Sequence, residues 1–496
     1  MSSRMQTRVL LSIMMFLEYA VWGAWAPILG ATLGGRLHAT GASIGAIYGI
    51  LWIAFIITPF IGGQLVDRYM SGQLFLAIAS VVCAVAAFMM SKEQNIGAFS
   101  GWMWVWSLAF APTLGITNSI AFYHLRRQQN EKVADDGDRS RFIMPFKLTT
   151  GLTIAGIVGL LGFIIWRSSQ GGTWSQTEIT GATISGIIVV IFALVPMLLN
   201  DMSKPDDVER SFSVIRTAGT VGWIIASMLL TAYLLLKPAT AKGAWAPYEE
   251  MQLTAIFGVA LTLVALFIPN TPPSKEAKDP WAFTKAFTLF KLVPGFTVFM
   301  IISFLINTEF QFYYTLSAPF LEDKDGLNAN HAMIPLFKSI AQYAEIACLG
   351  ILTPFSLKYL GMKKTLVIGA IAWPARYFLF ALMRPDWLVL ASMSLHGIGF
   401  AFVFVTSFIY IDRVAPKDIR ASAQGLFNLI TLGIGNTIGS FFSGYLKDYF
   451  THDGHTNWRM VFVVPAALTI SCAIAFWLTF KEPKKEEASA AEVAAV

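Results

Sequence analysis

The chain has 496 residues, of which 55% are hydrophobic and only 13% are charged. A soluble domain carries about 25% charged residues, so this chain could not cover a water-exposed surface and is expected to lie in a lipid bilayer. The net charge of +6 is spread over many short loops, which argues against binding a nucleic-acid polymer.

Apolar runs of about 19 residues or more predict membrane-spanning helices. In chain order they cover approximately residues 9–33, 41–66, 72–91, 98–124, 148–166, 180–200, 212–236, 251–269, 293–320, 332–357, 364–383, 386–411, 420–446 and 458–480. Lys and Arg concentrate in the loops on one side of these fourteen helices, which the positive-inside rule assigns to the cytoplasm. We therefore expect an all-α, multi-pass protein of the cell (inner) membrane, with both termini in the cytoplasm.

The predicted helices divide into two groups. The polar, proline-containing segment 270–285 separates eight spans from six. Removing the pair at 148–166 and 180–200 leaves six plus six, the plan of the major facilitator superfamily. The expected parts are an N-terminal bundle at 1–270 with the inserted pair at about 148–200, a cytoplasmic linker at 271–292, a C-terminal bundle at 293–482 and a cytoplasmic tail at 483–496.

A short motif supports this plan. The segment GGQLVDRYMSGQ at 62–73 resembles the glycine–aspartate–basic signature between helices two and three of that superfamily. The resemblance implies that Asp67 and Arg68 form a structural latch between neighbouring helices at the cytoplasmic side.

Ionisable residues inside apolar runs are the strongest functional signal. Lys338, Gln342 and Glu345 are spaced i, i+4, i+7 and share one helical face, and Arg216 lies in another span. An ionised group at the bilayer centre costs roughly 3 kcal/mol on insertion scales, so such residues usually face a water-filled cavity and serve a substrate or ion. The competing interpretations are a structural ion pair of Glu345 with Lys338 or Arg216, and an Arg216 side chain that reaches the cytoplasmic interface.

The whole chain resembles bacterial nucleoside:proton symporters of the major facilitator superfamily. The stretches that carry the resemblance are EYAVWGAW (18–25), GASIGAIYG (41–49), APTLGITNSIAFYHL (111–125), IRTAGTVGW (215–223), TEFQ (308–311), SIAQYAEI (339–346), AWPARYFLFAL (372–382) and IRASAQGLF (419–427). The long interval at 126–214 holds the additional helical pair, to which the sequence assigns no function.

The resemblance implies a nucleoside site in a central cavity. The implied substrate-binding residues are Arg216, Thr220, Trp223, Gln311, Tyr314, Gln342, Glu345 and an aromatic residue, Phe402 or Phe404. A carboxylate and amides can hydrogen-bond vicinal ribose hydroxyls, and aromatic rings can stack on a flat base. Tyr314 stands where the family pattern leads us to expect an amide, which leaves the preferred base open.

Proton coupling requires a carboxyl group that can change its protonation state. Glu345 is the first candidate, followed by Glu309 and Glu18, although Glu18 could instead make a helix–helix hydrogen bond. For Arg376 a structural latch is favoured. For His396 hydrogen-bonded packing is favoured, with a proton relay as the alternative.

An intramembrane enzyme is the competing class of function. It would require a nucleophile with a base, or metal ligands at close spacing, and no HExxH or GxSxG pattern occurs. No Walker A pattern occurs either, which argues against ATP-driven transport. We therefore expect no catalytic residues, metal or cofactor, and a monomeric proton-coupled secondary transporter that moves nucleosides by alternating access. The alternative is a proton-coupled symporter of oligosaccharides or another small polar metabolite.

Overall fold

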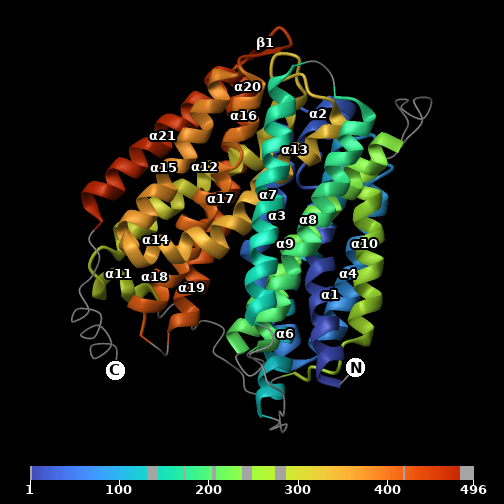
Figure 1. Ribbon diagram of the computed structural model, residues 1–496, viewed down its shortest axis with the longest axis vertical. Helices are drawn as coiled ribbons and strands as arrows, with labels where there is room; N and C mark the ends of the chain where they lie inside the picture. Colours follow the sequence, from blue (N-terminus) through green and yellow to red (C-terminus); the bar gives the residue numbers. More distant parts are fainter. Residues whose placement is uncertain are drawn as a thin grey trace. The chain divides into compact units, whose positions relative to one another are not determined.

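The structure is a computed structural model that describes residues 3–130, 143–171, 174–203, 208–236, 248–273, 286–416 and 419–480. These residues are almost entirely helical (Figure 1). The described strands are β1 (Thr451–His452) and β2 (His455–Thr456), which pair antiparallel with Thr451 opposite Thr456. The predicted tail at 483–496 lies outside the described residues.

The predicted spans coincide with helices, although not every span is one continuous helix. Eleven helices in the described part of the chain are long and apolar enough to cross a membrane, and Gln176–Phe192 is a shorter apolar helix. The run at 9–33 breaks around Pro27, which lacks the N–H that a helix ladder needs. The run at 332–357 contains a 3₁₀ turn, two α-helices and a π-helical turn.

The chain folds into two compact units. Unit 1 comprises Met1–Leu37, Ile57–Ala277 and Asn330–Ser339, and unit 2 comprises His38–Ile56, Lys278–Ala329 and Ile340–Val496. Helices α3 (Gly41–Arg68) and α13 (Ile334–Ala347) therefore contribute residues to both units. The predicted division into bundles, linker and tail stays a prediction.

Unit 1 is a helical bundle. Its other elements are α1 (Ser3–Gly23), α2 (Leu29–Leu37), α4 (Gly72–Met90), α5 (Ile96–Phe110), α6 (Thr113–Asn130), α7 (Ile143–Ser169), α8 (Gln176–Ser203), α9 (Val208–Leu236), α10 (Glu249–Phe267) and the 3₁₀ turn η4 (His331–Met333).

Helices α1 and α9 pack with their backbones in close contact. A Cβ atom on Gly222 would lie 2.0 Å from the carbonyl oxygen of Phe16, so only glycine permits this approach. Trp22 and Trp223 meet edge-to-face beside it, with ring centroids 5.2 Å apart. Small residues at helix crossings are a common means of association in lipid, where apolar burial between helices gives little driving force.

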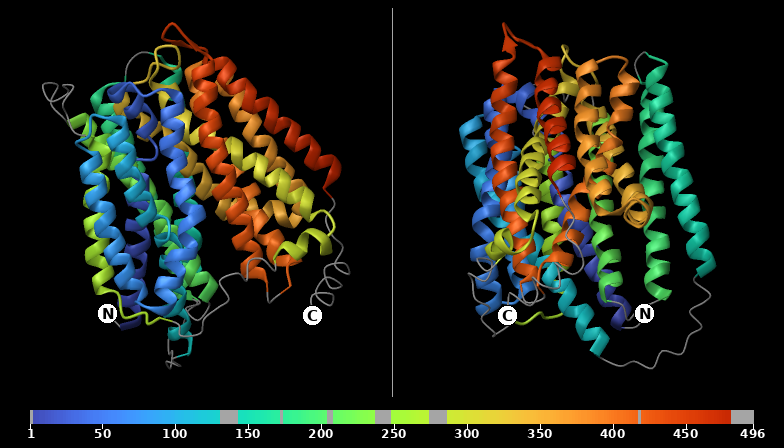
Figure 2. Two further views of the ribbon diagram at one scale, coloured as in Figure 1. Left: turned by 180° about the vertical axis from the view of Figure 1, so that it is seen from behind. Right: turned by 90° about the vertical axis from the view of Figure 1, so that its left-hand side faces the viewer.

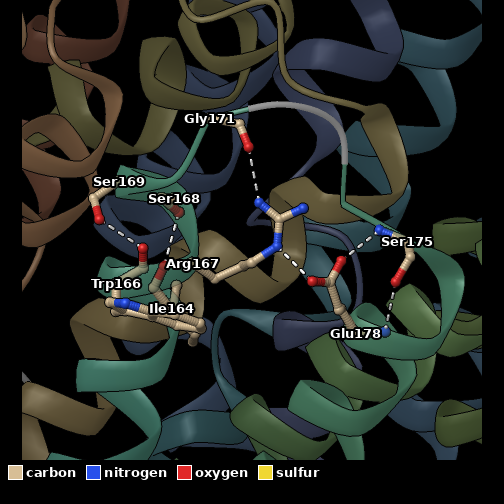
Figure 3. Close-up of polar contacts among 8 residues, drawn as sticks. All are labelled: Ile164, Trp166, Arg167, Ser168, Ser169, Gly171, Ser175 and Glu178. Carbon is tan, nitrogen blue, oxygen red and sulfur yellow. Dashed lines mark hydrogen bonds and ion pairs between the residues drawn. The ribbon is translucent and has the colours of Figure 1, made fainter.

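The additional helical pair lies at the edge of unit 1. Helix α7 packs against α8, and α8 packs against α9 (Figure 2). Only 22% of the α7 span is buried, so most of its apolar surface is left for lipid. The turn between the two helices is closed by polar contacts, because Arg167 donates hydrogen bonds to Glu178 and to the Gly171 carbonyl, while Glu178 accepts from the Ser175 amide (Figure 3).

Unit 2 is a second helical bundle. Its other elements are α11 (Leu289–Leu292), α12 (Phe296–Glu322), η5 (Cys348–Leu352), α14 (Thr353–Tyr359), α15 (Gly361–Leu382), α16 (Asp386–Ser392), α17 (Leu395–Phe400), η6 (Ala401–Val405), α18 (Thr406–Val414), α19 (Arg420–Asn428), η7 (Leu429–Gly435), α20 (Asn436–Tyr449), β1, β2 and α21 (Trp458–Thr479). The turns η5, η6 and η7 are π-helical, a feature that often marks functional sites.

The close approach of α1 and α9 predicts that Gly222→Ala lowers the stability of the protein. The added methyl must push the helices apart, and overpacking of this kind typically costs about 1–3 kcal/mol. Thermal unfolding of the purified protein should therefore show a lower midpoint for Gly222→Ala than for Gly115→Ala, whose Cβ would meet nothing within 4 Å. Equal midpoints for the two variants would contradict the packing.

Candidate functional site

In unit 2, three helices bring a carboxyl, an imidazole and a guanidinium group next to one another, with the imidazole between the other two. Glu345 lies on α13, His396 on α17 and Arg376 on α15. Arg376 Nη1 is 3.1 Å from His396 Nδ1, and His396 Nε2 is 3.9 Å from Glu345 Oε2. The side chains of Arg376 and His396 are fully buried, whereas that of Glu345 is 13% exposed. The row therefore runs from a buried cation to a carboxyl group that water can reach.

A glycine allows this arrangement. A Cβ atom on Gly397 would lie 2.5 Å from the carbonyl carbon of Ala344 and 2.7 Å from the Glu345 amide nitrogen. The absence of a side chain thus lets α17 approach the backbone of α13 directly beside Glu345. His396 precedes Gly397 in sequence, so this contact also brings the imidazole toward the carboxyl group.

Aromatic rings surround the imidazole of His396. Phe310 of α12 stacks on it with centroids 5.8 Å apart, and Phe400 stacks on it at 6.0 Å. Trp373 meets it edge-on at 5.5 Å, and Tyr314 does so at 6.2 Å. Tyr314 and Phe400 are half-buried. These two can therefore present apolar ring surface near the carboxyl group without being part of the closed core.

Gln342 and Glu345 are one turn apart on α13, as the helical spacing predicts. Gln342 is 7% exposed. Both can hydrogen-bond a polar molecule, since the amide donates and accepts while an ionised carboxylate accepts. Lys338 lies on the same helix and is 3% exposed.

Gln311 on α12 is held by two hydrogen bonds. Its Oε1 accepts from Trp52 Nε1 of α3 at 3.1 Å and from Ser440 Oγ of α20 at 3.3 Å. Its Nε2 has no hydrogen-bond partner among the described residues, although it is buried. A buried amide donor without a protein acceptor is costly, and a ligand oxygen would satisfy it.

Glu309 points elsewhere, although it is close in sequence. Two residues along an α-helix turn the side chain by about 200°, so Glu309 and Gln311 lie on different faces of α12. The carboxyl group of Glu309 lies near the hydroxyl of Thr469 on α21, and that hydroxyl donates to the Pro465 carbonyl. Glu309 is 3% exposed. Its proposed coupling role stays a prediction.

The predicted aromatic pair lies in the π-helical turn η6. Phe404 packs on Phe310 with centroids 5.2 Å apart and on Phe400 at 5.1 Å. Phe402 instead joins a small cluster with Cys348 and Ala401. Of the two, Phe404 is thus the one that contacts the rings around His396.

Unit 1 holds the predicted residues of α9. Arg216 and Thr220 are half-buried, Trp223 is buried, and their spacing sets them along one face of the helix. The Arg216 guanidinium lies 4.0 Å from the ring centroid of Tyr19 on α1, a cation–π contact. These three residues belong to unit 1, whereas Gln311, Tyr314, Gln342 and Glu345 belong to unit 2.

Glu18 of α1 is fully buried in unit 1. Its Oε1 accepts a hydrogen bond from Thr113 Oγ1 of α6 at 2.5 Å. This is the helix–helix bond that competes with a coupling role for this residue. Asp67 and Arg68 end α3, but their side chains lie outside the described residues, so the latch stays a prediction.

The sequence interpretation did not assign Trp52, Phe310 or Phe400 to the site. An indole donor opposite an amide in apolar helices is a usable signal for Trp52, since such a group needs an acceptor when buried. Nothing in the sequence distinguishes Phe310 and Phe400 from other aromatic residues. In the described part of the chain, no group of three or more His, Cys, Asp or Glu side chains is placed to hold a metal ion.

Comparisons with known proteins agree with this architecture. Residues 5–202 and 182–485 match the model of the family described as Nucleoside H+ symporter. The nucleoside permease NupG of Escherichia coli is 27% identical over 491 residues, with 96% of each chain covered. The xanthosine permease of the same organism is 26% identical over 495 residues, covering 96% of this chain and 97% of the permease.

Solved structures confirm the predicted all-α major facilitator fold. The crystal structure of a mutant of the nucleoside transporter NupG matches with a TM-score of 0.72 and 26% identity, covering 96% of this chain and 100% of that one. A bacterial homologue of the human lysosomal transporter Spinster matches with a TM-score of 0.63 over 100% of this chain and 99% of that one. Because the two chains are only 12% identical, this match shows the fold alone.

The bond between Trp52 and Gln311 predicts the outcome of Trp52→Phe. The variant loses the indole donor and should lower the free energy of unfolding by about 1 kcal/mol beyond the loss of ring volume. Trp458→Phe is a matched control, because Trp458 is buried and its Nε1 has no hydrogen-bond partner among the described residues. Thermal unfolding of both purified variants tests this, and a smaller loss in Trp52→Phe would refute the bond.

Proposed function

Because this chain belongs to the nucleoside H+ symporter family, we propose that Gln311, Gln342 and Glu345 bind the nucleoside and that Glu345 carries the coupled proton. The chain is a proton-coupled secondary transporter of nucleosides and a multi-pass inner-membrane protein. Membership of this family confirms the prediction of a transporter rather than an enzyme. The family does not favour the alternative of an oligosaccharide substrate.

The observation that carries the proposal is the polar face of α13. Gln342 and Glu345 lie one turn apart in a mostly apolar helix, and Glu345 keeps access to water. Vicinal ribose hydroxyls match this pair, since one hydroxyl can donate to the carbonyl oxygen of the protonated carboxyl group while the other accepts from the amide. A carboxyl group that binds both a proton and a hydroxyl links the two ligands, as symport requires.

Aromatic rings supply the second part of recognition. Tyr314 and Phe400 are half-buried, and both contact the imidazole of His396, which lies beside Glu345. A flat nucleobase can stack on such rings, and stacking tolerates different bases because each has a π-face. Phe404 packs against Phe400, with ring centroids 5.1 Å apart.

The remaining assignments rest on family resemblance. Arg216, Thr220 and Trp223 share one face of α9, and they are proposed to contact substrate as well. The Lys and Arg distribution supports cytoplasmic termini. A monomer is proposed as the transporting unit, because each chain contains both of the helical bundles that alternating access needs.

Removing the Gln342 amide should weaken nucleoside binding more than folding, whereas Gln311→Ala also removes the hydrogen bonds from Trp52 and Ser440 and so lowers stability as well. Gln342→Ala and Gln311→Ala should each cost about 1 kcal/mol of binding, roughly a fivefold loss of affinity, and Trp223→Ala should weaken binding through lost stacking. Binding of uridine and adenosine to the purified variants measures this. Gln176→Ala, an exposed amide at the start of α8, is the control. Unchanged affinity in all three variants would refute these assignments.

Replacing the carboxyl group should separate binding from coupling. Glu345→Gln keeps shape and hydrogen bonding but cannot bind and release a proton. It should abolish accumulation driven by a pH gradient in proteoliposomes, while counterflow exchange of labelled nucleoside persists. Asp386→Asn, at an exposed carboxylate that starts α16, should accumulate nucleoside normally. Normal accumulation by Glu345→Gln would instead direct attention to Glu309 and Glu18.

A further inference from the structure

In the row Arg376–His396–Glu345, the hydrogen-bond donors of Arg376 determine which ring nitrogen of His396 carries the proton. Arginine has only donors, so the Nη1 atom of Arg376 can bond the Nδ1 atom of His396 only if Nδ1 accepts. The imidazole then carries its single proton on Nε2. That nitrogen faces Oε2 of Glu345. The geometry thus assigns a neutral His396 whose N–H points at the carboxyl group.

Arg376 is fixed in this position by its surroundings. Its guanidinium lies 4.1 Å from the ring centroid of Tyr313, 4.7 Å from that of Trp373 and 5.0 Å from that of Tyr377. These cation–π contacts stabilise the charge without neutralising it. A fixed positive charge bonded to Nδ1 disfavours a second proton on His396, because an imidazolium would place a donor against a donor and a cation against a cation.

The other titratable groups that face the imidazole leave this assignment intact. Among the ring contacts of the described residues, these groups include the phenols of Tyr313 and Tyr314 on α12, whose ring centroids lie 5.0 Å and 6.2 Å from that of His396. The ring of Tyr313 is tilted by 35° against the imidazole, and that of Tyr314 meets it edge-to-face. The remaining neighbours, Phe310, Trp373 and Phe400, are held by stacking and edge contacts that restrict rotation of the imidazole.

We propose that His396 is a positioning residue that transmits the charge of Arg376 to Glu345 and thereby sets the pH at which the transporter releases its proton. The proposal rests on the role of Glu345 as proton carrier. In this scheme the ionised carboxylate accepts the Nε2–H bond. The protonated carboxyl gives up that bond and turns to the nucleoside. The separation of 3.9 Å is longer than a hydrogen bond, and rotation of the Glu345 side chain is what closes it.

The proton balance in this scheme is simple. The transported proton binds to and leaves from the Glu345 carboxyl group. His396 keeps one proton throughout, and Arg376 keeps its charge. His396 is therefore distinct from a relay residue, which would itself gain and lose the proton.

The test is the pH dependence of nucleoside binding to the purified full-length protein, with uridine and adenosine as probes. Affinity should fall as pH rises and Glu345 loses its proton. His396→Leu removes the donor that favours the ionised carboxylate, so the carboxyl holds its proton more tightly and the midpoint moves upward. The expected shift is about one pH unit, which is about a tenfold change in proton affinity.

Two further variants distinguish a neutral bridge from a titrating group. His396→Gln offers an acceptor to Arg376 and a donor to Glu345 but cannot titrate, so its midpoint should stay near that of the unmodified protein. His452→Gln, at an exposed histidine in β1, should behave as the unmodified protein does. An unshifted midpoint in a folded His396→Leu protein would overturn the proposal. An equal shift in His396→Leu and His396→Gln would overturn it as well.

A second measurement reads the unmodified protein directly, so it does not depend on a substitution that could disturb the packing of the site. ¹⁵N spectra of histidine-labelled protein report which ring nitrogen of His396 is protonated, with His396→Gln used to assign its signals. A neutral ring protonated at Nε2 near pH 7 is expected, and a ring protonated at Nδ1 or at both nitrogens would overturn the proposal. Nucleoside binding that does not depend on pH in the unmodified protein would instead refute the role of Glu345 as proton carrier.

Discussion

Close approach of helix backbones is the constraint on which the rest of this structure depends. In lipid, burying apolar side chains between helices gains little, so association relies on tight packing and on polar contacts between helices. At Gly222 the backbone of α9 meets that of α1, and at Gly397 the start of α17 meets α13. The second contact places His396 beside Glu345. Packing at a residue without a side chain thereby determines where two polar side chains meet.

The buried charge of Arg376 shows how the bundle accommodates a cation away from water. An unpaired ion in an apolar interior is very costly, yet Arg376 is fully buried. Three aromatic rings and one imidazole nitrogen surround it. The rings stabilise the charge without removing it, so its field remains available to the neighbouring groups. In the proposed scheme, this buried charge therefore acts on the neighbouring carboxyl group of Glu345 through His396.

The π-helical turns lie where the site needs irregular backbone. Turn η5 follows α13 directly after the segment that carries Gln342 and Glu345, and η6 follows α17 after His396 and Phe400. A π-helical turn inserts an additional residue and rotates the side chains that follow it. Phe404 thereby packs against Phe310 and Phe400, whereas Phe402 packs against Cys348. The spacing of these two phenylalanines predicts that they face different ways, and the packing of η6 decides which of them meets the rings around His396.

The sequence by itself determined the membrane environment, the helical spans and the polar face of α13, because hydropathy and helical period are local properties of the chain. It also identified the family through motifs that keep their order and spacing. The tertiary structure alone decided which distant groups meet. Arg376, His396 and Glu345 come from three helices, Trp52 reaches Gln311 across 259 positions, and Glu309 lies near Thr469 of α21. Such contacts depend on crossing geometry and side-chain direction, which no local pattern encodes.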